Sequence, residues 1–167
     1  MNSVKASYIL EVFEMLFLIG SAADLTPSLP TQYLINQYLP DNFSPQDVEE
    51  GLVNKRLAKK TNGNITLEPV VDLLVRSALS SDTIWVVKCG GIDEPVFVLK
   101  ADDIFLHIMR YPHISNAWKI TPYKNKETLL GEFDVMAISE VRRVNKHGEQ
   151  RFLDTDEKNR WIEGDAK

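Results

Sequence analysis

The sequence of 167 residues has little of what catalytic centres and disulfide frameworks are built from: one cysteine and three histidines. Cys89 has no second cysteine to pair with, which excludes a disulfide-stabilised scaffold and fits a reducing compartment. His107 and His113 straddle Pro112 at a spacing that matches no familiar zinc motif. No sequence signature of a thiol enzyme surrounds Cys89. An enzyme that uses Cys89 as nucleophile and His107 as base is therefore the least favoured of the three functions considered below. The sequence therefore predicts a protein that is not an enzyme, with no catalytic residues, cofactor-binding residues or metal ligands.

An excess of positive charge and a long apolar run are also missing. Lys and Arg number 19 against 24 Asp and Glu, a formal net charge of −5, which disfavours a nucleic-acid coat and a polybasic membrane binder. The most apolar stretch, from Tyr8 to Ala23, is interrupted by Glu11 and Glu14, whereas a membrane span needs ~20 apolar residues. We interpret this stretch as a buried first element and expect a cytoplasmic protein without a signal peptide or membrane span.

The first half does contain a series of helix signals. Thr31 and Ser44 are suitable N-caps, and Pro45 follows Ser44 at the first helical position. Asn62-Gly63 predicts a tight turn, after which apolar residues recur at helical spacing. Three helices separated by short loops are expected, over 32–39, from 45 to 51 or 54, and over 67–78.

The second half contains β-branched and aromatic runs, which are typical of strands. Turn signals separate these runs, and one short helical segment interrupts them. Strands are expected over 84–87, 96–99, 104–111 and 118–121, a helix over 124–133, and a last hairpin of 135–144 with 149–153. We therefore predict an α+β fold in a single domain, residues 1–167. It has a helical N-terminal half followed by a mainly antiparallel β-sheet with flanking short helices.

A basic cluster, defined by Lys55, Arg56, Lys59 and Lys60, is the strongest charge feature. A helix, a basic segment, a tight turn and another helix are compatible with a winged-helix-like DNA-binding transcription regulator, which is the second hypothesis. The net acidity and the lack of another basic patch on the expected helices disfavour nucleic acid as the partner. A solvated helix end is the commoner meaning of such a cluster.

Short motifs occur in order along most of the chain: 8–20, a proline-containing loop 25–30, Glu50-Gly51-Leu52-Val53, 63–75, the hairpin 83–101 and the closing residues 141–161. In this order the sequence resembles the EspG-like accessory proteins of type VII (ESX) secretion, including the EsaE-like branch. The chain is shorter than the mycobacterial members of this family, so the resemblance does not extend to their additional helical parts.

The resemblance implies an EspG-like fold and a cytoplasmic, non-enzymatic chaperone or adaptor. Such a protein binds small helical secreted proteins, keeps them soluble and helps deliver them to a secretion ATPase. The neighbouring residues in the sequence suggest two contact sites. Ile92, followed by Asp93 and Glu94, is a candidate contact loop. Trp118, which lies beside polar residues, is a candidate interface anchor. The alternative is structural, with Trp118 in the core and Ile92 only capping the hairpin.

Overall fold

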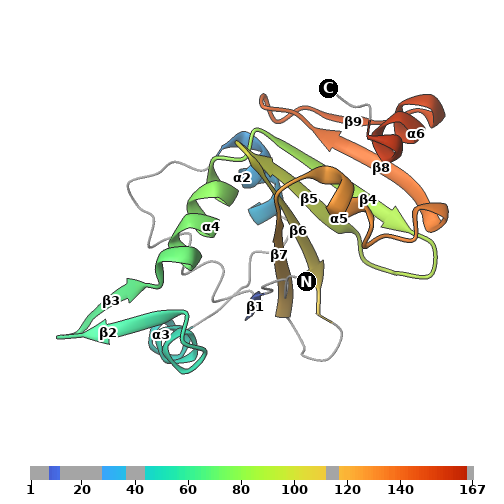
Figure 1. The fold of residues 1–167 in the computed structure, drawn as a ribbon. Helices are drawn as coiled ribbons and strands as arrows, with labels where there is room; N and C mark the ends of the chain where they lie inside the picture. Colours follow the sequence, from blue (N-terminus) through green and yellow to red (C-terminus); the bar gives the residue numbers. More distant parts are fainter. Residues whose placement is uncertain (1–7, 12–27, 37–43, 112–116, 165–167) are drawn as a thin grey trace.

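An antiparallel sheet is the main feature of the computed structural model, which describes residues 8–11, 28–36, 44–111 and 117–164 (Figure 1). Within them, seven strands follow the order β1-β7-β6-β5-β4-β8-β9. These strands are β1 (Tyr8–Glu11), β4 (Thr83–Cys89), β5 (Val96–Ala101), β6 (Ile104–Arg110), β7 (Ala117–Tyr123), β8 (Ile138–Val144) and β9 (Gln150–Phe152). A separate two-stranded sheet consists of β2 (Ala58–Thr61) and β3 (Asn64–Leu67).

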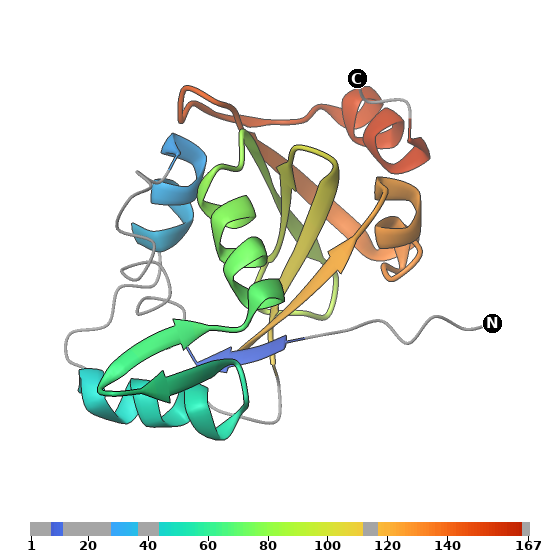
Figure 2. The same cartoon turned by 60° about the vertical axis from the view of Figure 1, so that its left-hand side comes forward.

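Helices cover both faces of the large sheet (Figure 2). The helices are α2 (Leu29–Asn36), α3 (Pro45–Asn54), α4 (Pro69–Leu79), α5 (Lys126–Leu130) and α6 (Thr155–Glu163), with a short 3-10 turn η1 (Val135–Ala137). Helix α4 packs on one face, and α5 and α6 pack on the other. The sheet is therefore the middle layer of three.

Strand β4 lies inside this arrangement and is buried on both faces. Ile84 and Val86 point into the core that α4 closes, whereas Trp85 and Val87 point into the core closed by α5 and α6. Successive strand residues face opposite sides of a sheet, so a strand covered on both sides needs a continuous apolar run. The run Ile84-Trp85-Val86-Val87 meets that requirement.

A third apolar cluster lies between α3, the β2–β3 hairpin and α4. Its buried members are Val48, Leu52, Leu57, Ala58 and Val71. Ser44 caps α3 by accepting a hydrogen bond from the backbone N–H of Asp47, as the sequence predicts. This cluster joins the hairpin to α4 and so connects it to the large sheet.

The predicted helical N-terminal half is wrong. In the described part of that half, the helices are short and alternate with strands: Tyr8–Glu11 is an edge strand paired with β7, and Ala58–Leu67 is a hairpin. Asn62 and Gly63 have φ values of 52° and 82°, the left-handed conformations that a tight hairpin turn requires. Such a turn reverses the chain direction, so the flanking residues pair as strands. Lys59 and Lys60 of the basic cluster therefore lie in β2, whereas Lys55 is the C-cap of α3.

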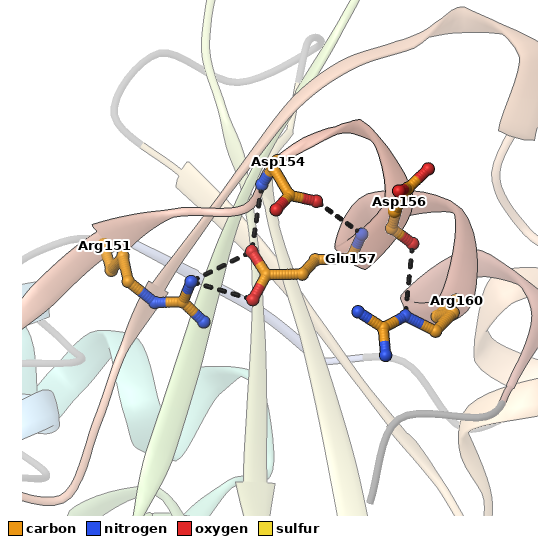
Figure 3. A network of polar contacts seen from close by, with 5 residues as sticks. All are labelled: Arg151, Asp154, Asp156, Glu157 and Arg160. Atoms are coloured by element: carbon orange, nitrogen blue, oxygen red, sulfur yellow. Dashed lines mark hydrogen bonds and ion pairs between the residues drawn. The ribbon is translucent and has the colours of Figure 1, made fainter.

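The strands expected in the second half are present, with small shifts of their ends. The sequence did not predict α6, which begins with a reciprocal capping box (Figure 3). The Asp154 carboxylate accepts a hydrogen bond from the Glu157 N–H at 2.8 Å, and the Glu157 carboxylate accepts one from the Asp154 N–H at 3.0 Å. Arg151 donates to both carboxylate oxygens of Glu157 at 2.8 and 2.9 Å. The hydrogen bond from the Asp154 N–H is the main cause that lowers the pKa of Glu157, and the hydrogen bond from Arg151 is the next.

The start of α6 yields a first prediction. Asp154→Ala removes the side-chain acceptor, so we expect the free energy of unfolding to fall by about 1 kcal/mol. Asp154→Asn is the matched control, because it keeps an acceptor at the same position and should stay close to wild type. Urea unfolding followed by circular dichroism measures both, and an equal loss in the two variants would contradict the role given to the cap.

A second prediction concerns His107, whose side chain is buried in β6 with the rings of Tyr123 and Phe133 set edge-on at 6.3 and 5.3 Å. Burial lowers the pKa of His107 from 6.5 to about 4; nearby Glu132 opposes this change and Lys119 adds to it. Because the unfolded chain binds the proton first, the stability from neutral His107 is present above about pH 6.5 and is lost as pH falls toward about 4.

The full effect corresponds to about 3 kcal/mol. His107→Gln should reduce the decline of the unfolding free energy across this pH interval, measured by urea unfolding at a series of pH values. Carboxylates titrate in the same range, so the readout is the difference in slope between variant and wild type. Identical slopes would overturn this assignment to His107.

Candidate functional site

Two segments far apart in the sequence meet at one end of the large sheet. Residues 90–95 connect β4 to β5, and η1 leads into β8. Strand β8 pairs with β4 so that Ile138 lies opposite Cys89, and the Gly90 N–H donates a hydrogen bond to the Ala137 carbonyl at 2.7 Å. The β4–β5 loop and η1 therefore lie side by side at the paired ends of β4 and β8.

Apolar side chains are exposed on both segments. Ile92 is 52% exposed, Val135 38% and Met136 90%. Exposed large apolar residues that gather in one place indicate a contact surface more strongly than scattered ones do. Met136 adds a flexible, polarisable side chain of the kind that suits protein contacts. We call the set Ile92, Asp93, Glu94, Asp134, Val135 and Met136 the end surface.

Acidic residues lie beside these apolar side chains. Asp93 is exposed, and Glu94 forms an ion pair with Arg110 at the end of β6, which ties the loop to the neighbouring strand. The Asp134 carboxylate accepts a hydrogen bond from the Met136 N–H at 3.2 Å and holds the turn that presents Met136. Three carboxylates against one arginine give this surface a negative balance, which complements a basic partner.

Two of the groups considered for chemistry lie below the surface. The Cys89 thiol is buried at the end of β4, and burial, followed by the nearby Asp134 charge, raises its pKa. A thiol with a raised pKa is a weak nucleophile at neutral pH. Within the described residues no hydrogen bond joins Cys89 to His107, and His113 lies outside those residues. The geometry therefore offers no support for a Cys–His pair.

The four predicted contact residues do not form one site. Ile92, Asp93 and Glu94 share the β4–β5 loop, whereas Trp118 is 4% exposed and its ring lies 6.0 Å from that of Phe97. Trp118 thus belongs to the core, as the structural alternative proposed. Val135 and Met136 are not among the predicted contact residues, because the apolar run 135–144 favours a single strand. The adjacent Asp134, a good capping residue, is the signal that separates η1 from β8.

The basic cluster carries ion pairs with acidic neighbours. Lys59 contacts Glu68 and Lys60 contacts Glu49, both at 3.0 Å between nitrogen and oxygen. These contacts connect the β2–β3 hairpin to α3 and to the start of α4. They reduce the local positive potential and make the hairpin a weak candidate for nucleic-acid binding.

No protein-family model matches the chain, and no curated protein matches it either. Across the described residues, no helix is both long and apolar enough to cross a membrane. The same part of the chain holds no group of three or more His, Cys, Asp or Glu placed to bind a metal ion.

Proposed function

We propose that this protein is a cytoplasmic, non-enzymatic chaperone or adaptor that binds a helical protein partner through the end surface. The observation that carries the proposal is the exposure of Ile92, Val135 and Met136 on two segments that the Gly90–Ala137 hydrogen bond links. Anchored segments bind at a low cost in conformational entropy, because little ordering is needed on association.

The chemistry of the surface defines the partner. An apolar centre with Asp93, Glu94 and Asp134 beside it fits a helix that carries apolar residues on one face and Lys or Arg beside them. The EspG-like resemblance supports the same class of partner and specifies it as a small helical substrate of type VII secretion, delivered to a secretion ATPase. The DNA-binding alternative has less support, since the basic cluster is partly neutralised by ion pairs.

The third prediction tests the end surface directly. Ile92→Ala combined with Met136→Ala should weaken binding of the small helical protein that the wild-type chain captures from native cytosol by at least about tenfold. Asp93→Lys alone should weaken binding of this partner more at low salt than at high salt, because salt screens the charge contribution. Binding is measured by titration calorimetry with purified partner.

Leu73→Ala is the matched control, because Leu73 is 60% exposed on α4, away from the end surface. It should leave the dissociation constant unchanged, and every variant should keep the wild-type melting temperature. Equal binding by the end-surface and control variants would rule out this surface. Recovery of DNA from native cytosol without a helical protein would favour the transcription-regulator alternative.

A further inference from the structure

Strand β9 forms one outer edge of the large sheet, and both views show no other strand beyond it (Figures 1 and 2). Arg143 lies opposite Arg151, and the bonds from the Leu153 N–H to the Val141 carbonyl and from the Asn145 N–H to the Glu149 carbonyl flank this pair. In an antiparallel ladder, hydrogen-bonded and non-hydrogen-bonded pairs alternate.

The backbone groups of Arg151 are therefore directed toward β8. Those of Gln150 and Phe152 are directed away from β8, toward the open edge. No hydrogen bond to these groups occurs among the described residues. The edge thus presents two N–H groups and two carbonyls in the spacing that an added strand requires.

The side chains at this edge differ between the two faces of the sheet. On one face Phe152 is 57% exposed, and the Arg142 guanidinium lies 5.6 Å from the centre of its ring. On the other face Arg143 and Arg151 are cross-strand neighbours. Glu157 pairs with Arg151 (Figure 3), and Arg143 has no ion pair with any described residue, so positive charge exceeds negative charge there.

These charges decide between two occupants of the edge. A second copy of the chain, pairing antiparallel through both Gln150 and Phe152, would place Arg151 directly opposite Arg151 of that copy. Like charges directly opposite each other destabilise a strand pair. A partner strand with an acidic residue at that position would instead gain a favourable cross-strand contact.

We propose that the β9 edge binds an extended acidic peptide segment of a partner as an additional antiparallel strand. Its acidic residue lies opposite Arg151, and the preceding residue is apolar and lies opposite Phe152. This site is distinct from the end surface: β9 pairs with Arg142–Val144 at the end of β8, whereas the end surface lies before the first residue of β8. The inference therefore does not depend on the proposed function.

The fourth prediction uses a short labelled peptide of alternating valine and glutamate as the probe, with a valine–lysine peptide as its control. We expect the acidic peptide to bind the full chain, measured by fluorescence anisotropy, and the basic peptide to bind at least about tenfold more weakly.

Two substitutions at position 152 distinguish the contribution of the backbone N–H to peptide binding from that of the aromatic ring. Phe152→Ala and Phe152→Pro both remove the aromatic ring, but only proline also removes the outward N–H. The β8–β9 hydrogen bonds do not use this N–H, so both variants should fold, which circular dichroism checks. The proline variant should bind the acidic peptide about threefold to tenfold more weakly than the alanine variant.

Equal affinities of these two variants would overturn strand addition, and so would the absence of acidic-peptide binding to wild type. Sedimentation that shows a dimer, lost in Phe152→Pro, would identify a second copy as the occupant and contradict the proposal. Because the helical partner of the end surface is not used, a failure here leaves the proposed function standing.

Discussion

The pairing of β4 with β8 determines how the C-terminal part of the chain is placed against the sheet. It joins strands separated by about fifty residues of sequence and places the C-terminal hairpin beside β4, an inner strand of the sheet. A buried strand must satisfy all its backbone N–H and carbonyl groups, so β4 needs partners on both sides. Strand β5 provides one ladder and β8 the other, and together they fix the position of α5, η1 and α6.

This pairing also separates two surfaces with different chemistry. Before β8, the register brings η1 against the β4–β5 loop, and an apolar surface with acidic residues results. At the other end of β8, the register leaves β9 as an open edge with arginines on both faces. A chain with a net charge of −5 therefore presents acidic residues before the start of β8 and arginines beside its other end.

The sequence was most informative where a local rule decides the structure. The Ser44–Pro45 cap located α3, and the apolar runs from Thr83 onward located the strands. Predictions from the sequence were wrong where the surroundings of a residue are set by residues distant in the sequence. Trp118 is a candidate interface anchor because Asn116 and Lys119 nearby are polar, yet adjacent strand residues face opposite sides of the sheet. The helical N-terminal half failed because a turn at Asn62-Gly63 specifies strands on both sides. The contact of Gly90 with Ala137 arises only from long-range pairing, which no local pattern encodes.

The pairing of β4 with β8 extends into the β4–β5 loop through the Gly90–Ala137 hydrogen bond and so holds the two segments of the end surface together. The amide hydrogen-exchange rate of Gly90 tests it most directly, since only the bond to the Ala137 carbonyl protects this loop amide. The structure predicts exchange nearly as slow as that of the neighbouring β4 amides. Exchange at the rate of an unprotected loop amide would show that the two segments are not held together and would contradict the account.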